Sequence, residues 1–374
     1  MRALAIVPQT KTVRMVERPR PALKASDNVE LRVLRVGVCG TDRDEVCGGP
    51  ARAPEGEEEL VIGHEMIGQV IAVSSNVARV RPGDYAVLTV RRGCGKCRPC
   101  AMSRPDMCMS GRYRERGIWG LDGYQTDRVV DADSFIVRVP AELESIGVLT
   151  EPLSVAEKAI EEAVRVQTAR LPASLATADW LRGRQCLVAG LGPIGLLAAL
   201  VLRLRDATVF GLDIVDPGSA RARWLEGIGG QYLDGRQADA KRLGDDVGTF
   251  DLIVDATGIP SLEFNLIDAL KFNGVYALTG LPRGDRPIHV RGAELIRRLV
   301  LRNQLVLGSV NASRDHFQRA VDDLGRARRR WGDHIDKMIT HRYPCDEYAK
   351  ALTAGGEDAI KVVVEWHQGD RRGV

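Results

Sequence analysis

The run Cys186-Leu-Val-Ala-Gly190-Leu-Gly192-Pro-Ile-Gly195 decides the fold of this 374-residue chain. A short apolar strand passes through the pattern G-x-G-x-x-G into a second apolar run, predicted to be helical, that ends at Arg205. The three glycines permit a tight turn, close approach of a pyrophosphate and packing of helix on strand, while the free amides of the helix N-terminus attract phosphate. This pattern predicts a dinucleotide-binding turn. The residues predicted to contact the cofactor there are Gly190, Gly192, Pro193, Ile194 and Gly195.

Further apolar runs follow this turn and alternate with helical stretches. We predict strands at Ala207–Asp213, Asp251–Asp255, Gly274–Leu278 and Gln304–Val310. Alternating strands and helices are typical of a doubly wound parallel sheet, so residues 182–311 are predicted to form a Rossmann domain. Before this domain we predict a helix at Leu153–Arg165 and a connecting segment at Gln167–Arg182.

Asp213 ends the second of these strands and bears on the choice of cofactor. A carboxylate at this place accepts hydrogen bonds from the adenosine ribose and repels a 2′-phosphate. The sequence therefore predicts NAD as the preferred cofactor. Arg221 and Arg223 lie downstream and can reach a phosphate, which keeps NADP as the alternative.

The N-terminal half of the chain has a different composition and is rich in valine, glycine and turn residues. Strands are predicted at Asn28–Gly37, Gly68–Val73 and Gly83–Val90. Short β-branched runs between glycines are typical of a small barrel-like β-domain. The strand-like run Ile360–Glu365 is predicted to fold back onto it. We therefore expect two α/β domains, a β-rich one from residues 1–181 and 312–374 and the Rossmann domain inserted into it.

Four cysteines stand close together in the β-rich half, in the pattern C-x2-C-x2-C-x7-C. They are Cys94, Cys97, Cys100 and Cys108. This spacing lets one short loop wrap four thiolates around a tetrahedral ion, which predicts a closed, structural zinc site. The other cysteines are scattered, so a reducing cytoplasm fits the chain better than a disulfide-forming compartment.

A second, incomplete set of zinc ligands lies earlier in the chain. Cys39, in Cys-Gly-Thr-Asp, and His64, in Gly-His-Glu, supply a thiolate and an imidazole. A carboxylate can complete the set, and Glu65 and Glu151 are both candidates. Three protein ligands leave one position for water or a substrate oxygen, as Lewis-acid catalysis requires. A closed site, an open site and a dinucleotide turn in one chain together indicate hydride transfer.

Composition excludes other classes of function. Apolar residues make up 44% and charged residues 28% of the chain, as in an ordinary soluble globular protein. The net charge is +3 with no basic block or acidic tail, so neither nucleic acid nor a membrane surface is predicted as a partner. The opening residues lack a signal-peptide pattern, and the apolar run around Leu196–Leu202 is too short to span a bilayer. We expect a cytoplasmic enzyme that acts on a small molecule.

The order of these motifs resembles the zinc-dependent medium-chain dehydrogenase family. Four further stretches are similar to its glucose (aldose) 1-dehydrogenase branch known from archaea. They are Arg91-Arg-Gly-Cys-Gly95, Arg104-Pro-Asp-Met-Cys108, the run Ile146–Ile160 and Gly308-Ser-Val-Asn311. The resemblance runs over nearly the whole chain. It implies a GroES-like catalytic domain, an inserted Rossmann domain, and oxidation of a sugar C1 hydroxyl to a lactone.

The resemblance also implies roles for single residues. Cys39, His64 and Glu151 would bind the catalytic zinc, with Glu65 as an alternate or water-linked ligand, and the four clustered cysteines would bind a second, structural zinc. Glu115 and Asn311 fall at sugar-contacting positions, and Asn311 is also expected at the cofactor. We expect Thr41 to accept the proton of the substrate hydroxyl and to pass it on, with Glu65 beside it.

Two positions depart from the glucose pattern. Val90 stands where this branch often has Asn, and Leu301 stands where it often has His. An apolar side chain offers a hydroxyl no hydrogen bond, so a polyol, amino sugar or cyclitol oxidised at a secondary alcohol is the alternative substrate. The alternative outside the enzymes is a non-catalytic zinc and nucleotide protein, such as a redox sensor. The presence of Cys39 and His64 argues against it.

The run Leu301–Val310 predicts self-association. It is strongly apolar and comes late in the order of strands, hence near an edge of the sheet. An exposed apolar edge invites pairing with another chain unless it is covered. We therefore expect a homodimer or homotetramer.

Overall fold

The computed structural model describes residues 1–172, 179–284 and 287–367. Its contacts divide the chain into two compact units. The first comprises Met1–Ser154, Asn311–Gly325 and Ile335–Val374, and the second comprises Val155–Val310 and Arg326–His334. The sequence analysis placed the boundaries at 181/182 and 311/312, whereas these contacts assign most of the helix after residue 154 to the second unit.

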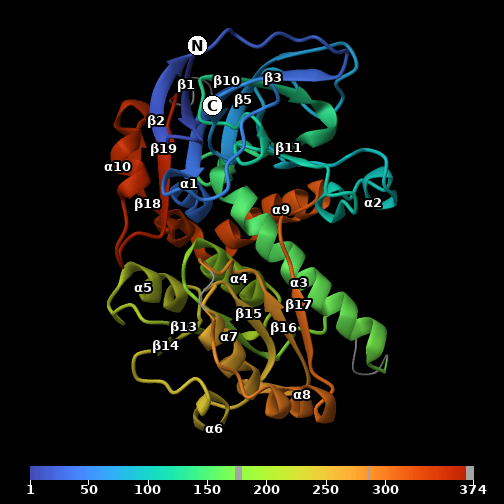
Figure 1. Ribbon diagram of the computed structural model, residues 1–374, viewed down its shortest axis with the longest axis vertical. Helices are drawn as coiled ribbons and strands as arrows, with labels where there is room; N and C mark the ends of the chain where they lie inside the picture. Colours follow the sequence, from blue (N-terminus) through green and yellow to red (C-terminus); the bar gives the residue numbers. More distant parts are fainter. Residues whose placement is uncertain (173–178, 285–286, 368–374) are drawn as a thin grey trace. The chain divides into compact units, whose positions relative to one another are not determined.

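The first unit is rich in β-strands (Figure 1). Its strands are β1 (Arg2–Val7), β2 (Thr12–Glu17), β3 (Asn28–Val38), β4 (Leu60–Val61), β5 (Glu65–Val73), β6 (Tyr85–Leu88), β7 (Arg91–Arg92), β8 (Arg114–Arg116), β9 (Gly120–Leu121), β10 (Arg128–Ala132), β11 (Ile136–Val139), β18 (Ile339–Pro344) and β19 (Lys361–Glu365). Its short helices are α1 (Gly40–Val46), α2 (Arg98–Ala101) and α10 (Tyr348–Thr353), with a 3₁₀ turn η1 (Pro105–Met107).

The largest sheet of this unit runs in the order β11-β6-β5-β3-β19-β18, with β10 paired to β3. Apolar side chains from these strands form its core, for example Leu31 and Val36 of β3 and Met66 of β5. The tail strand β19 pairs antiparallel with β3, with Val362 opposite Val38. The predicted return of Ile360–Glu365 to the β-rich half is therefore confirmed.

The second unit is built on a parallel sheet. Its strands are β12 (Gln185–Ala189), β13 (Thr208–Asp213), β14 (Gln231–Asp234), β15 (Phe250–Asp255), β16 (Leu270–Leu278) and β17 (Leu305–Gly308). Its helices are α4 (Pro193–Leu204), α5 (Ala220–Gly227), α6 (Leu243–Asp246), α7 (Pro260–Leu266) and α8 (Gly292–Leu301). The order β14-β13-β12-β15-β16-β17 has its switch point at β12, as in a doubly wound Rossmann sheet.

Two long helices contribute to both units, α3 (Thr150–Arg170) and α9 (Arg314–Trp331). The predicted helix Leu153–Arg165 is therefore too short. The prediction of a connecting segment from Gln167 is wrong at its start, because α3 continues to Arg170; residues 173–178 of that segment lie outside the described residues. Gln167 continues the helix because its amide donates to the carbonyl of Asn273 at 2.7 Å.

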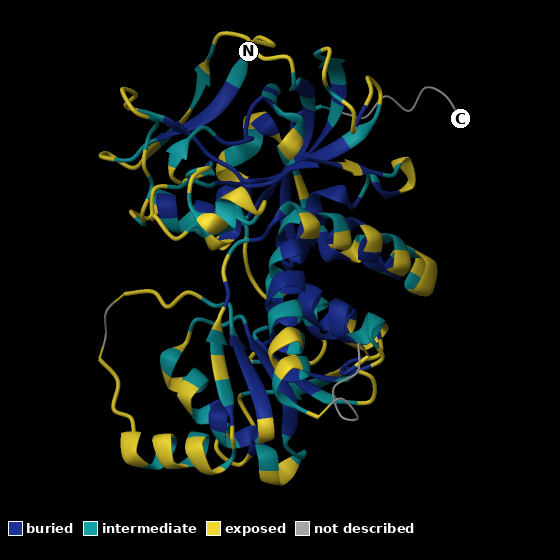
Figure 2. Cartoon of the chain, turned by 90° about the vertical axis from the view of Figure 1, so that its right-hand side faces the viewer, coloured by how far each residue is buried: buried dark blue, intermediate teal, exposed yellow. Residues whose placement is uncertain are grey.

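The core of the second unit lies on the central strands. Every residue of β15 is buried, and α4 buries the unbroken run from Gly195 to Leu202. In Figure 2 these strands are mostly dark blue, whereas the helix after the grey stretch at the lower left, α8, is largely yellow. Among the described residues, no helix combines the length and the apolar character needed to cross a membrane.

Candidate functional site

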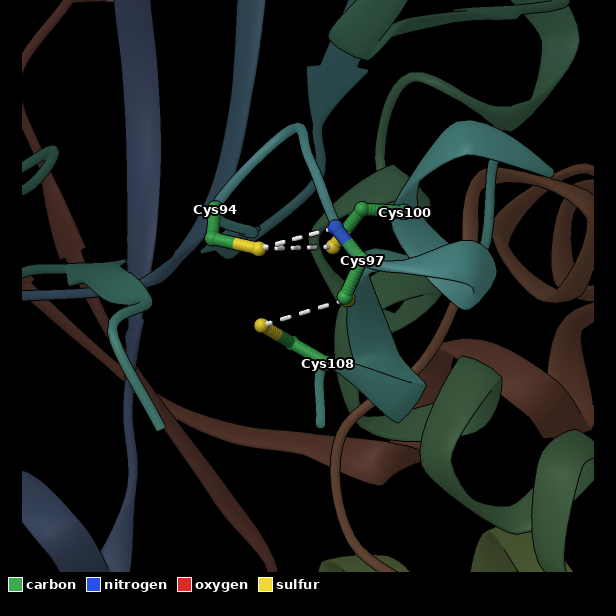
Figure 3. Close-up of side chains that lie close together, drawn as sticks. All are labelled: Cys94, Cys97, Cys100 and Cys108. Carbon is green, nitrogen blue, oxygen red and sulfur yellow. Dashed lines mark hydrogen bonds between the residues drawn. The ribbon is translucent and has the colours of Figure 1, made fainter. Parts of the chain in front are cut away.

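The four clustered cysteines converge on one point of the first unit (Figure 3). Cys97 caps α2, Cys100 lies within α2, and Cys108 follows η1. All four Sγ atoms lie within 4.8 Å of one another, with 4.0 Å between Cys94 and Cys100 and 3.9 Å between Cys97 and Cys108. Thiolates around a tetrahedral zinc at about 2.3 Å stand about 3.8 Å apart. The donor set therefore fits a closed zinc site.

The electrostatics of this loop also fit a cation. The Ser110 hydroxyl and the backbone amides of Cys97 and Lys96 lower the pKa of Cys94 to about 5. Burial and a hydrogen bond with Cys97 raise the pKa of Cys100 to about 12. Some of these thiols thus favour the thiolate form while a neighbour resists it, and a divalent ion among them would let all four be thiolates.

The second cluster brings together Cys39, His64 and Glu65, whose ligand atoms also lie within 4.8 Å of one another. Cys39 follows β3 and caps α1, His64 precedes β5, and Glu65 is the first residue of β5. Gly37 of β3 pairs with Glu65 across the sheet. A Cβ on Gly37 would collide with Oε2 of Glu65, so glycine at this position makes room for the carboxylate. Sulfur, nitrogen and oxygen donors in this number fit an open zinc site.

Asp42 stands behind His64. Its Oδ1 is 3.7 Å from Nδ1 of His64, and its Oδ2 accepts a hydrogen bond from the amide of Cys39 at 2.7 Å. Burial alone would lower the pKa of His64, but the carboxylate of Asp42 and the thiol of Cys39 raise it well above its usual value. The pocket therefore favours positive charge, and a carboxylate behind a histidine is the usual support of a metal ligand.

Lys361 pairs with Glu65 inside the first unit. Its Nζ lies 2.7 and 2.6 Å from the two carboxylate oxygens, and both side chains are 1% exposed. Lys361 belongs to β19, the strand that returns from the end of the chain. The ion pair fixes the orientation of Glu65 beside Cys39 and His64.

Glu151, at the start of α3, does not belong to the cluster of three ligand atoms. Burial raises the pKa of its carboxyl to about 7, and the nearby charge of His64 opposes that rise. The carboxyl thus lies close enough to His64 for a strong electrostatic interaction. Both candidates for the third ligand lie near His64. Glu65 is the one whose carboxylate belongs to the cluster of ligand atoms, and it is already paired to Lys361.

Thr41 lies on the first turn of α1. Its Oγ1 is 3.9 Å from Sγ of Cys39. The turn that carries Cys39 thus also carries the hydroxyl expected to take the substrate proton.

Glu115 and Asn311, the two predicted sugar contacts, meet in the first unit. Nδ2 of Asn311 donates to Oε1 of Glu115 at 2.7 Å. Arg91 lies opposite Glu115 in the pairing of β7 with β8 and forms an ion pair with it at 2.9 Å. Gly117, two residues after Glu115, packs so closely on the backbone of Gly63 that a Cβ would not fit between them. The Glu115 strand is therefore anchored next to His64.

The two residues that depart from the glucose pattern lie in different surroundings. Val90 is buried in the core of the first unit, with 2% of its surface exposed. Leu301 is 69% exposed at the end of α8, before the amino end of β17. Ligands of a doubly wound sheet bind at the carboxyl ends of its strands. Leu301 therefore lies at the opposite end of its own sheet from the cofactor turn.

The glycine-rich turn has the geometry that the sequence predicts. Gly190 has a φ of 85°, and a Cβ there would stand 2.9 Å from Thr257. A Cβ on Gly195 would collide with the carbonyl of Gly190, whereas a Cβ on Gly192 would have no described atom within 4 Å. Gly192 caps α4 and Pro193 is its first residue, followed by Ile194. The turn is open where a pyrophosphate would approach.

Asp213 closes this turn from the side. Its carboxylate accepts hydrogen bonds from the amides of Leu191 and Ile214, each at 2.7 Å. The guanidinium of Arg221 is 3.9 Å from the same carboxylate, and that of Arg223 donates to the carbonyl of Gly218.

The sequence analysis missed two buried charges at the site, Lys361 and Arg91. A signal existed for each. Lys361 interrupts an otherwise apolar strand, and a lysine on such a strand needs a buried carboxylate. Arg91 begins the pair Arg91–Arg92, of which each is only 7% exposed. These stretches do not indicate which carboxylate is the partner, because Glu65 is distant from Lys361 along the chain and Glu115 is distant from Arg91.

Comparison with known proteins agrees with this geometry. The alcohol dehydrogenase GroES-like domain family matches residues 25–141, and the glucose dehydrogenase C-terminus family matches residues 144–366. The chain is 38% identical over 369 residues to a glucose 1-dehydrogenase of Methanocella arvoryzae, which covers 98% of this chain and 99% of the relative. It is 39% identical over 372 residues to that of Thermoproteus tenax, with the same coverage.

A solved structure extends the agreement to the fold. The glucose dehydrogenase of Haloferax mediterranei, in complex with NADP, Zn and gluconolactone, superposes with a TM-score of 0.88 at 31% identity, over 98% of this chain and 100% of that one. Family models, relatives and fold all point the same way. The chain therefore belongs to the zinc-dependent medium-chain dehydrogenase family, in its glucose dehydrogenase branch.

Proposed function

We propose that this enzyme oxidises the C1 hydroxyl of an aldose, with glucose as the first candidate, to the lactone and transfers the hydride to NAD. The cluster of Cys39, His64 and Glu65 carries the proposal, because its open donor set stands in a chain that also has the dinucleotide turn. The relative from Haloferax mediterranei, whose structure contains NADP, zinc and gluconolactone, supports the same oxidation of the sugar. The preference for NAD in this chain rests on the carboxylate of Asp213 beside the glycine-rich turn.

We assign the chemistry as follows. Cys39 and His64 would hold one zinc ion, with Glu65 or Glu151 as third ligand, and the four-cysteine loop would hold a second. Zinc at the open site supplies the Lewis acidity that makes a sugar hydroxyl easier to deprotonate. Thr41 accepts the hydroxyl proton and passes it on, while Asp42 orients His64 and Lys361 orients Glu65. The hydride leaves C1 for C4 of the nicotinamide, and the C1–O bond becomes a carbonyl.

A substrate panel tests this proposal. We expect aldoses to be oxidised with NAD more efficiently than polyols, amino sugars and cyclitols, as measured by the absorbance of the reduced nicotinamide. The product from glucose should be the 1,5-lactone. Preferred turnover of a cyclitol or an open-chain polyol would instead favour oxidation at a secondary alcohol.

We also propose a cytoplasmic location. None of the eight cysteines, all of which the structure describes, forms a disulfide, and this supports a reducing compartment.

Replacing Thr41 by valine is expected to lower kcat more than tenfold while leaving the KM for NAD nearly unchanged. Valine keeps the shape of threonine but lacks the hydroxyl that takes the proton, so the loss should exceed about 1.4 kcal/mol of transition-state stabilisation. Steady-state kinetics measure both values. Thr41→Ser keeps a hydroxyl and should retain most of the activity. A smaller loss in Thr41→Val would place the proton acceptor elsewhere.

Replacing Asp213 by alanine is expected to reduce the preference for NAD over NADP. A 2′-phosphate near this carboxylate would be repelled by a few kcal/mol, on the order of 4 kcal/mol at 4 Å and intermediate dielectric. Arg236 cannot easily offset this repulsion, because it is held by Asp234 at 2.8 Å and by Asp216 at 3.1 Å. The ratio of kcat/KM for the two cofactors measures the preference. 

Asp216→Ala is the control for the Asp213 variant. It removes a charge from the same loop without touching the amide of Leu191. Arg236 loses one partner but stays paired with Asp234 at 2.8 Å, so the ratio should change less than in Asp213→Ala. Wild-type kcat/KM that is higher with NADP than with NAD would contradict the proposed preference, whatever the variants do.

We further propose that the protein forms a homodimer or homotetramer through the edge strand β17. This strand ends the sheet order, and α8 beside it in sequence has no buried residue. Val306 on β17 is 42% exposed, and Val300 on α8 is 67% exposed. Val306→Lys should shift the protein toward monomer in sedimentation velocity, whereas Val166→Lys on α3 should not. A wild-type monomer at micromolar concentration would exclude this association.

A further inference from the structure

Asp255 is the last residue of β15 and lies at the carboxyl end of the parallel sheet. It stands opposite Ala189 of β12 on one side and Leu278 of β16 on the other. It is fully buried, and its carboxylate forms no ion pair within the part of the chain that the structure describes. A buried carboxylate without a cation must be held by hydrogen bonds, so its donors identify its role.

The carboxylate holds the loop that follows its own strand. Its Oδ1 accepts hydrogen bonds from the amide of Thr257 at 2.9 Å and from that of Gly258 at 3.4 Å. The hydroxyl of Thr257 donates to the same oxygen at 3.0 Å and accepts from the amide of Ile259 at 3.1 Å. A threonine hydroxyl has a single proton to donate, and here that proton is used inside the loop.

The backbone of Asp255 holds a second loop, the one that follows β16. Its carbonyl accepts hydrogen bonds from the amide of Thr279 at 2.8 Å, from the hydroxyl of Thr279 at 2.6 Å and from the amide of Gly280 at 3.1 Å. A Cβ on Gly280 would collide with the amide nitrogen of Gly258, so the two loops touch backbone to backbone. One residue thus ties together the loops that follow two neighbouring strands.

The first of these loops also lies against the glycine-rich turn. The amide of Ala256 donates to the carbonyl of Ala189 at 2.8 Å, and a Cβ on Gly190 would stand only 2.9 Å from Cγ2 of Thr257. A doubly wound sheet binds a dinucleotide with two halves, each of which takes one mononucleotide. The first half carries the glycine-rich turn and Asp213, where the adenosine is expected. The loops after β15 and β16 therefore belong to the nicotinamide half.

We propose that Asp255 is a positioning residue that holds both loops where they receive the nicotinamide half of the cofactor. Because it is fully buried, it acts through the loops rather than by contact with the cofactor. Without the carboxylate, the amides of Thr257 and Gly258 lose their acceptor, and the loop loses its fixed place beside the glycine-rich turn. The use of NAD(P) belongs to the family, so this inference holds whichever alcohol donates the hydride.

Direct binding tests this role without turnover. Asp255→Ala removes the acceptor, and Thr257→Val removes the hydroxyl while keeping a methyl group near Gly190. Calorimetric titration should show about tenfold weaker binding of NADH by each variant, because the hydrogen bonds that order the loop are lost. ADP lacks the nicotinamide half, so both variants should bind it as the wild type does. In steady-state kinetics the KM for NAD should rise more than kcat falls.

Two controls separate positioning from stability. Asp251 is a buried carboxylate at the amino end of the same strand, where it accepts hydrogen bonds from the amide of Gln185 at 3.1 Å and from Nζ of Lys271 at 2.8 Å. Asp251→Ala should lower the melting temperature, as Asp255→Ala should, but leave the affinity for NADH unchanged. Thr257→Ser keeps the hydroxyl and should bind NADH nearly as tightly as the wild type.

The outcomes separate this inference from the proposed function. Wild-type affinity for NADH in both loop variants, an equal loss for NADH and ADP, or the same loss in Asp251→Ala would overturn the positioning role. If Asp255→Ala does not fold, Thr257→Val decides the question, because it keeps the carboxylate and the backbone contacts. A wild-type enzyme that oxidises no aldose would overturn the proposed function and leave this inference intact.

Discussion

Replacing Cys39 by alanine is expected to abolish turnover while the chain stays folded. Cys39 supplies one of three ligand atoms that lie within 4.8 Å of one another, and an open site held by three ligands contributes less to folding than a closed site. Loss of about 4 kcal/mol of transition-state stabilisation would lower kcat about a thousandfold. Steady-state kinetics measure the loss, and near-UV circular dichroism measures the fold. The zinc content measured by metal analysis should fall from two ions per chain to one.

Replacing Cys100 by alanine should instead disturb the local fold, because it removes a ligand of the proposed closed zinc site. In this proposed site, four thiolates around one ion would order the lobe from Cys94 to Cys108, so removal of one ligand should unfold that lobe locally. Hydrogen exchange of residues 94–112 should rise, together with loss of one zinc ion. Cys47→Ala, at an exposed cysteine outside both clusters, is the matched control and should change neither property. A single zinc ion per wild-type chain, or full activity in Cys39→Ala, would refute the two-site assignment.

Replacing Lys361 by methionine is expected to cost about 3–5 kcal/mol of unfolding free energy, because it leaves the buried carboxylate of Glu65 without its partner. The pair is 2.6 Å apart, and each side chain is only 1% exposed, so water cannot replace the lysine. Chemical denaturation monitored by tryptophan fluorescence measures the change. Activity should fall as well, because Glu65 beside Cys39 and His64 would lose its fixed orientation.

The double variant Lys361→Met with Glu65→Gln tests the reason for that loss. Once the charge of Glu65 is removed, the methionine no longer strands a buried anion, so the double variant should be more stable than Lys361→Met alone. Lys350→Met is the control, since Lys350 pairs with Glu347 at the surface and should cost less than about 1 kcal/mol. Equal losses in Lys361→Met and the double variant would show that packing, rather than charge, explains the effect.

Much of the fold could be predicted from local patterns. Apolar runs alternating with helical stretches predicted β12, β13, β15 and β16, because buried parallel strands are continuously apolar, and predicted the apolar edge strand β17 as well. The edge strand β14 escaped prediction, since its run Gln-Tyr-Leu-Asp is half exposed and has no clear period. The end of α3 also escaped, because the contact that prolongs it, between Gln167 and the carbonyl of Asn273, joins residues far apart in the chain.

Some parts of the candidate site could likewise be predicted from the sequence, and others could not. The sequence by itself identified the four cysteines, the glycine-rich turn, and Cys39 and His64, because each is recognised from residue types in a short motif. It left the third ligand open between Glu65 and Glu151, and the structure groups Glu65 with Cys39 and His64. Only the tertiary structure decided which buried charges meet. The pairing of Lys361 with Glu65 follows from β19 lying against β3, and that of Arg91 with Glu115 follows from the register of β7 on β8. A buried charge requires a partner, but the sequence does not name it, because the partner is chosen by how distant strands pair.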